Sequence, residues 1–232
     1  MQEKMAQPPA ARHSLADVPS GPSAGPDAPY VLSVAYAPAR IPTPEDSMFR
    51  PIAAILLVAA LIGAKATSKF TLGSKDVWQG KTIPLRHVFN GMGCTGENLS
   101  PALEWDNAPE GARSFAVTMY DPDAPTGSGW WHWVVYNIPA GTTSLPTGAG
   151  DASKNLLPPG AVQGNTDFGT PGYGGPCPPV GDKPHHYHIT IYALNVDKLE
   201  IPANATAAYV GFNLHAHTRA KAELVAVYGR SK

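Results

Sequence analysis

The sequence is short of cysteine, of charge and of long hydrophobic runs. It has 2 cysteines and 15% charged residues in 232, and its formal net charge is -1. Because there is no basic excess, the chain lacks the electrostatic footprint of a protein that binds nucleic acid or an anionic membrane surface. The H-E-x-x-H and P-loop patterns are also missing, which removes two common signatures of metal-dependent hydrolysis and nucleotide binding. We therefore predict no enzyme activity, no cofactor and no nucleic-acid partner.

The first 66 residues differ from the rest of the chain. Residues 1–47 mix proline, alanine, serine and glycine without a helical or strand period, so we predict that they are disordered, or that they are a mis-annotated extension. Residues 48–66 have a short basic start, an apolar run and an Ala-x-Ala site, which are the parts of a signal peptide. The run of about a dozen apolar residues is shorter than the ~20 that a membrane-spanning helix needs.

We therefore expect translation to begin at Met48 and a signal peptidase to cut after Ala66. The mature domain, residues 67–232, would then be periplasmic or secreted, without a stable membrane anchor. Two alternatives stay open. The apolar run could be an uncleaved N-terminal anchor, or residues 1–47 could be made and mask the signal.

The mature region is predicted to be mainly β. Runs rich in β-branched and aromatic residues alternate with Gly, Pro, Asn and Asp turns, and runs that are apolar on both faces suit a sheet covered on each side, as in a sandwich. One helix is predicted near 205–223, with Asn204 as its N-cap. Region 145–183, heavy in glycine and proline, is predicted to be a loop that carries function. The predicted strands are 70–72, 103–105, 114–120, 130–138, 187–194 and 224–228.

Two carboxylates follow directly after the predicted strand 114–120. Asp121 and Asp123 alternate with prolines, the second of them Pro125, and proline restricts both its own φ and the residue before it, so this loop should be rigid. After a glycine turn the chain returns as a strand in which His132 shares a face with Trp130. The hairpin should therefore bring His132 back toward Asp121.

A second set of candidate site residues lies near the end of the long loop. Gly172, Gly174 and Gly175 would let backbone N–H groups approach a ligand closely, and Pro178 and Pro179 stiffen the far side.

Four residues, His185-His186-Tyr187-His188, then open a strand. Alternation along the strand sends His186 and His188 to the outer face and Tyr187 inward. Because His185 lies at the start of this strand, it is best placed to join Tyr187 beside a ligand.

These two groups of residues resemble the phosphatidylethanolamine-binding protein family, most of all its bacterial Raf kinase inhibitor-like branch and the exported members of that branch. The likeness rests on Asp121-Pro122-Asp123-Ala124-Pro125 with the Trp-rich strand, and on Gly-Pro-Cys-Pro-Pro-x-Gly with His185-His186-Tyr187, and it covers residues 68–230. It implies an antiparallel β-sandwich with a C-terminal helix and a small pocket for phosphate, acetate or a phosphoryl head group. By motif position, the pocket residues would be Asp121, Pro125, His132, Gly174, Gly175, Pro178, His185 and Tyr187.

Neither motif contains an arginine, so a bidentate clamp on phosphate is missing and the affinity should be modest. An anion beside Asp121 would be repelled unless His132 is held as a cation or the phosphate keeps a proton, since its second pKa is about 6. Each role has a plainer alternative: Asp123, and less so Asp121, could accept hydrogen bonds from its own turn, and His132 and Tyr187 could be core residues.

The two cysteines, Cys94 and Cys177, both lie in loop segments. An even count in an exported chain favours one disulfide, which would tie the glycine-rich loop to the early part of the domain. The alternative is a free Cys177 thiol that acts as a nucleophile.

Three function classes follow. The first is an exported binding protein with a pocket for a small anionic or phosphoryl ligand, with regulation of a protein partner as an additional role. The second, which the family name suggests, is an inhibitor of a kinase or protease that acts by protein contact. The third is a hydrolase with a metal held by Asp121, His132 and His185, three ligands that would suit zinc or iron(II).

Overall fold

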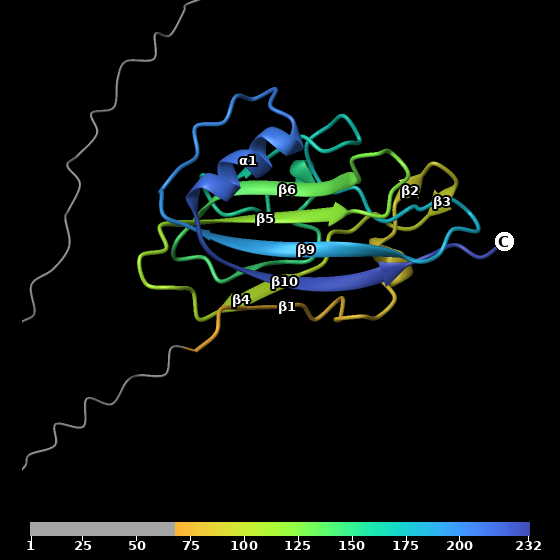
Figure 1. Ribbon diagram of the computed structural model, residues 1–232, viewed down its shortest axis with the longest axis horizontal. Helices are drawn as coiled ribbons and strands as arrows, with labels where there is room; N and C mark the ends of the chain where they lie inside the picture. The colour runs from red at the N-terminus through yellow and green to blue at the C-terminus, as the bar shows by residue number, and fades with distance from the viewer. Residues whose placement is uncertain (1–67) are drawn as a thin grey trace, which may run out of the picture. The chain divides into compact units, whose positions relative to one another are not determined.

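The computed structural model describes residues 68–232, which form two main β-sheets and one α-helix (Figure 1). The expectations for residues 1–47 and for the signal peptide at 48–66 lie outside the described residues. Neighbouring strands pair antiparallel throughout. The large sheet has the order β10-β9-β5-β6-β8, with β5 at Ser114–Asp121, β6 at Trp130–Pro139, β8 at Val162–Gln163, β9 at His185–Leu194 and β10 at Thr218–Tyr228.

The smaller elements complete the fold. A three-stranded sheet has the order β1-β4-β7, and a separate hairpin is formed by β2 and β3. Within the described part of the chain, no helix is long and apolar enough to cross a membrane. The bounds are β1 at Thr71–Gly73, β2 at Asn90–Gly91, β3 at Cys94–Thr95, β4 at Leu103–Asp106, β7 at Ser144–Leu145, the 3-10 helices η1 at Leu85–His87 and η2 at Ala152–Lys154, and α1 at Ala207–His217.

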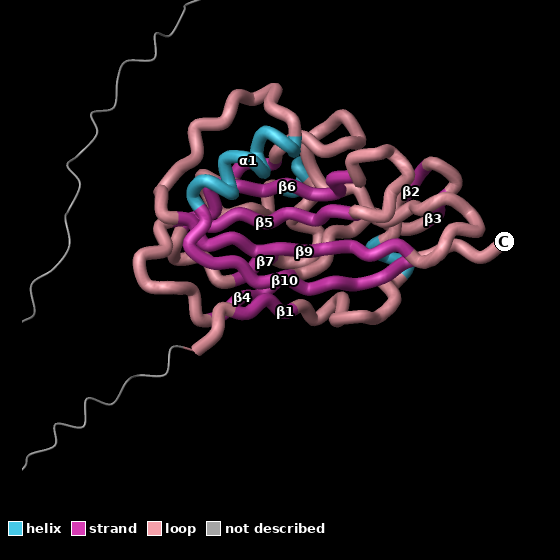
Figure 2. The backbone as a smooth tube through the Cα atoms, viewed as in Figure 1, coloured by secondary structure: helices cyan, strands magenta, loops and turns pink. Residues whose placement is uncertain are grey.

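The large sheet is covered on both faces, which explains why its central strands are apolar on both faces. On one face, Phe115 of β5 packs with Trp105 of β4, their rings 5.6 Å apart, in the core between the two sheets. On the other face, Val134 of β6 packs with Val210 and Leu214 of α1. Figure 2 shows this helix lying over the large sheet. The prediction of a mainly β sandwich with a helix near the C-terminus is confirmed.

The helix, however, is shorter than predicted. It begins after Thr206, whose side chain accepts a hydrogen bond from Tyr209 N and acts as the N-cap in place of Asn204. It ends at His217, and the residues up to 223 belong to β10 instead. That segment pairs with β9 along nearly its whole length. Strand pairing therefore overrides the helix propensity of its alanines and lysines.

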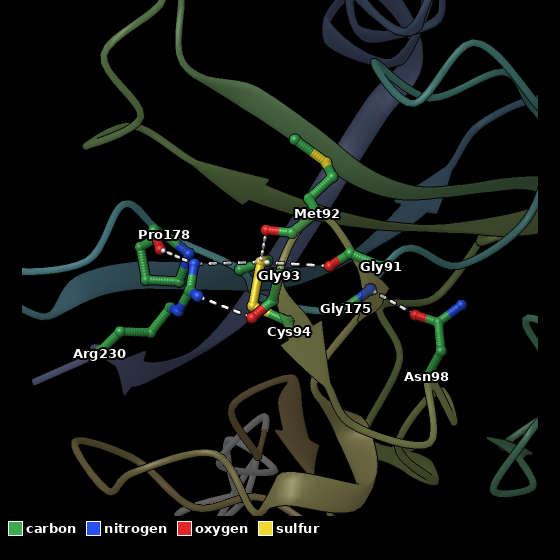
Figure 3. Close-up of a disulfide and its surroundings, with 9 residues drawn as sticks. Gly91, Met92, Gly93, Cys94, Asn98, Gly175, Pro178 and Arg230 are labelled. Carbon is green, nitrogen blue, oxygen red and sulfur yellow. Dashed lines mark hydrogen bonds between the residues drawn. A yellow bond between two sulfur atoms is a disulfide. The ribbon is translucent and has the colours of Figure 1, made fainter.

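The disulfide between Cys94 and Cys177 is present, with their Cα atoms 6.0 Å apart. It joins β3 to the loop that precedes β9 (Figure 3). Arg230 reinforces the junction, because its guanidinium donates to the carbonyl oxygens of Gly93 at 2.7 Å and Pro178 at 3.2 Å. The idea of a free Cys177 nucleophile is therefore wrong.

Region 145–183 is mostly irregular, as predicted, but it contributes β8 and η2 and begins within β7. β9 starts at His185 and β10 at Thr218, both earlier than the patterns predict. The early start of β9 matters for function, because it makes His185 the first residue of a buried strand.

Candidate functional site

Polar side chains from three strands meet where β5 ends. Asp121 is the last residue of β5 and pairs with Trp130 of β6, while Tyr120 pairs with His188 of β9. This register brings the start of β6 and the start of β9 to the same end of the sheet. A cavity of about 200 Å³ opens there, and it is lined by six of the expected residues: Asp121, Pro125, His132, Pro178, His185 and Tyr187.

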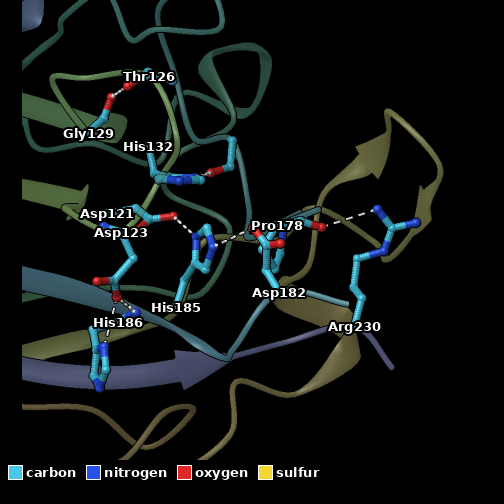
Figure 4. Close-up of polar contacts among 11 residues, drawn as sticks. Asp121, Asp123, Thr126, Gly129, His132, Pro178, Asp182, His185, His186 and Arg230 are labelled. Atoms are coloured by element: carbon cyan, nitrogen blue, oxygen red, sulfur yellow. Dashed lines mark hydrogen bonds and ion pairs between the residues drawn. The ribbon is translucent and has the colours of Figure 1, made fainter. Parts of the chain in front are cut away.

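Asp121 and His185 form a buried hydrogen-bonded pair at the base of the cavity. Asp121 Oδ2 lies 2.8 Å from His185 Nδ1, and the two residues are 2% and 4% exposed. Asp121 Oδ1 accepts a second hydrogen bond from Asp123 N at 2.8 Å. On the other side of the His185 ring, Nε2 lies 3.5 Å from Asp182 Oδ2 (Figure 4). The ring is therefore held between two carboxylates.

His132 is neutral and has a defined tautomer. Its Nδ1 lies 2.7 Å from the carbonyl oxygen of Gly174, and because a carbonyl can only accept, Nδ1 carries the hydrogen. Burial lowers the pKa of His132 to about 4, although the Gly174 carbonyl and the Asp121 charge oppose this shift. This lowered pKa disfavours the idea that His132 is held as a cation beside the anion at neutral pH. The other ring nitrogen, Nε2, is left as an acceptor.

Tyr187 presents a hydroxyl group without a partner. The residue is 0% exposed, and its Oη has no hydrogen-bond partner within the described part of the chain. Its ring meets the ring of His132 edge to face, with centroids 5.2 Å apart. Burial and the Asp121 charge raise the pKa of Tyr187, so the hydroxyl stays protonated as a donor. A buried donor that is left unpaired costs about 1–3 kcal/mol, which a ligand could offset.

Gly174 and Gly175 do not have the expected role of offering free amides. Gly174 N donates to the carbonyl oxygen of His132 at 2.9 Å, and Gly175 N donates to Asn98 Oδ1 at 2.7 Å. Neither glycine lines the cavity. A Cβ at Gly174 would overlap the ring of Phe168, so glycine is needed there for packing.

The turn-acceptor role expected for Asp123 belongs to Asp121, which also lines the cavity. Asp121 is the one that accepts from the turn, whereas Asp123 Oδ2 accepts from the backbone N and the ring Nδ1 of His186, at 2.7 and 2.8 Å. The hydrogen bond from His186 lowers the pKa of Asp123. This second pair is exposed, and His186 and His188 lie on the outer face as predicted.

Sequence reasoning missed the apolar wall of the cavity. Phe168 packs against both His132 and Trp130, with ring centroids 5.5 Å apart in each case. Phe168 belongs to the long loop and Met92 to the turn between β2 and β3, so no periodicity marks either of them. The carboxylate of Asp182 was missed for the same reason.

The described residues do not support a metal centre formed by Asp121, His132 and His185. Among residues 68–232 there is no group of three or more His, Cys, Asp or Glu side chains that could hold a metal ion. The Nδ1 atoms of His132 and His185 are already hydrogen-bonded to Gly174 and Asp121. The three ligands named for a hydrolase therefore line one cavity without forming a chelate.

Comparison with known proteins identifies related chains. A family model described as phosphatidylethanolamine-binding protein matches residues 73–229. The UPF0098 protein YbcL of Escherichia coli is 50% identical over 177 residues, which cover 76% of this chain and 96% of YbcL. LppC of Mycobacterium tuberculosis, named as a candidate lipoprotein, is 32% identical over 171 residues, 74% of this chain and 78% of LppC.

Solved structures agree with this picture. The crystal structure of E. coli YbcL, described as a new member of the mammalian PEBP family, superposes with a TM-score of 0.69 at 52% identity, covering 70% of this chain and 99% of YbcL. The Chlamydia trachomatis homologue CT736 gives a TM-score of 0.58 at 32% identity, covering 69% of this chain and 97% of CT736.

Proposed function

The chain belongs to the phosphatidylethanolamine-binding protein family, and we propose that it is an exported binding protein whose pocket takes a small anion, either phosphate or a phosphoryl head group. The observation that carries this proposal is the buried, unpartnered hydroxyl of Tyr187. Buried polar groups in folded proteins nearly always have a partner, so an orphaned donor on the wall of a cavity supports a role in ligand binding.

The size and chemistry of the cavity support a head group more than a large ligand. Its volume of about 200 Å³ is below the ~300–1,000 Å³ of drug-sized sites. No lysine or arginine lines it. An anion would therefore be held by neutral donors, and its affinity should be modest.

Export is supported by the signal-like segment at 48–66 and by the resemblance to LppC. Regulation of a protein partner, or inhibition of a kinase or protease by contact, stays a proposal that would be tested by capture of a stoichiometric complex.

Calorimetric titration of the purified protein with inorganic phosphate and with acetate tests the anion site. We expect saturable binding of phosphate that Tyr187→Phe weakens about 10-fold or more, because a hydrogen bond to a charged group is lost, and weaker binding of acetate, which has no hydrogen to donate. Tyr209→Phe is the matched control, since Tyr209 is a half-exposed tyrosine on α1 outside the cavity. Wild-type protein that binds neither anion would refute the proposal.

A further inference from the structure

We propose that the pocket selects a phosphate monoester that still carries one P–O–H group, and that it discriminates against phosphodiesters, including the head groups of intact phospholipids. The inference rests on the proposed function and adds the ligand class to it. It depends on which atoms at the cavity can donate a hydrogen bond and which can only accept.

The acceptor that distinguishes a monoester from a diester is His132 Nε2. The hydrogen bond from Nδ1 to the Gly174 carbonyl assigns the ring hydrogen to Nδ1. The orientation is reinforced from the backbone, because Gly174 N donates to the carbonyl oxygen of His132 at 2.9 Å. A neutral imidazole held in this way has a lone pair on Nε2, and Nε2 makes no hydrogen bond within residues 68–232.

The second acceptor, Asp121, is already in use. Its Oδ1 accepts from Asp123 N and its Oδ2 from His185 Nδ1. The carboxylate still contributes its negative charge to the cavity, where neither lysine nor arginine compensates it. A ligand with only bare oxygens would therefore direct lone pairs at His132 and repel Asp121.

A singly protonated monoester fits this pattern. One of its oxygens can accept from the Tyr187 hydroxyl, which has no other partner, while its P–O–H donates to His132 Nε2. The Tyr187 hydroxyl and His132 Nε2 are then both paired by the same phosphoryl group. The ester substituent would extend from the cavity along the apolar wall formed by Trp130, Phe168 and Met92. Met92 is 69% exposed, so this wall reaches the protein surface.

A phosphodiester has the same charge but lacks the donor. A carbon substituent replaces the hydrogen, so His132 Nε2 receives no hydrogen bond from the ligand, and a second substituent must enter a cavity of about 200 Å³. Sites that hydrogen-bond one group of a ligand reject analogues that lack it, because their own polar groups are left unpaired.

The test compares methyl phosphate with dimethyl phosphate by calorimetry on the purified protein at pH 5.5. The monoester is then mainly a monoanion, since its second pKa is about 6, so the two probes carry the same charge and differ by one methyl group. We expect methyl phosphate to bind on the order of 10-fold tighter or more. Inorganic phosphate, which also keeps a P–O–H, should bind like the monoester.

Two variants separate the roles. His132→Phe keeps an aromatic ring against Tyr187 but removes the acceptor, so the ratio of the two affinities should fall toward one. Tyr187→Phe removes a donor that serves both probes, so both affinities should fall and the ratio should persist. Equal affinities of wild-type protein for the two probes would overturn this inference alone. Failure to bind all three probes would overturn the proposed function itself.

Discussion

Asp121 Oδ2 and His185 Nδ1 are 2.8 Å apart at the base of the cavity, and both side chains are buried. On the opposite side of the same imidazole, Nε2 faces Asp182, whose side chain is 44% exposed. Asp182 thus adds a negative charge beside His185, which lines the site that we propose for anions.

Replacing Asp182 by asparagine should therefore strengthen phosphate binding. The carboxylate is partly exposed and solvent screens it, so we expect a gain of about 2- to 5-fold, in the range of surface charge interactions. Calorimetry at constant ionic strength measures it. Asp106→Asn removes an exposed carboxylate from β4, outside the cavity, and should change nothing. A weaker affinity in Asp182→Asn would mean that Asp182 helps to bind the ligand.

Phosphoryl binding should weaken as the pH rises from about 5.5 to 8. The ligand loses its proton near its second pKa of about 6 and then presents an additional charge to Asp121. His132, with a pKa of about 4, is neutral over this whole range and cannot compensate.

We expect the affinity for methyl phosphate to fall on the order of 10-fold across that range. Dimethyl phosphate has no proton to lose there, so any slope it shows reports groups of the protein. A monoester affinity that is as flat as that of the diester would contradict the mechanism.

His132 should also make the protein less stable in acid. Its pKa is lowered from 6.5 to about 4 on folding, so the unfolded chain binds more protons between these values. The stability that this contributes is fully present above pH 6.5 and is lost as the pH falls toward 4.

Urea unfolding at several pH values between 7 and 4 measures the slope. In His132→Phe the slope should be smaller by up to about 1.4 kcal/mol per pH unit, the value for one proton. The buried His87, whose pKa is also lowered by burial, should retain its own contribution. Replacing the exposed Phe212 by leucine, which removes no titratable group, is the control and should leave the slope unchanged.

The disulfide should contribute substantially to stability. Cys94 and Cys177 are 83 residues apart in sequence, and closing a long loop restricts the unfolded chain. The double variant Cys94→Ser, Cys177→Ser should lower the free energy of unfolding by about 2–4 kcal/mol. Chemical reduction of the wild-type protein should produce the same loss. A change below about 1 kcal/mol in both experiments would show that the bond is not a stabilising one.

Export should leave a mature chain that begins at Thr67. The intact mass of the protein recovered from the periplasm or medium tests this directly. Ala66→Arg should block cleavage, because the site requires small residues, and Ala60→Val within the apolar run should not. A secreted species that retains residues before Thr67 would reject the cleavage site.

The class of fold, and most of the residues that meet at the cavity, follow from local patterns in the chain. Alternation and turn residues are local signals, so five of the six predicted strands lie within two residues of their expected bounds, and the sixth, β10, begins six residues earlier than expected. The prolines around Asp121 and the strand containing His132 are local signals too. The resemblance to a known family then made it possible to place Asp121, His132, His185 and Tyr187 at one pocket.

The chemical role of each of these groups depends on contacts that form only in the folded protein. The helix stops at His217 because β9 offers a partner for the residues that follow, which the sequence of the segment does not reveal. The backbone N–H of Gly175 donates to the side chain of Asn98 and is not free for a ligand. The carbonyl oxygen of Gly174 fixes the tautomer of His132. Hydrogen-bond partners far apart in the chain, together with burial, set the protonation of a side chain, and neither can be read from its neighbours in sequence.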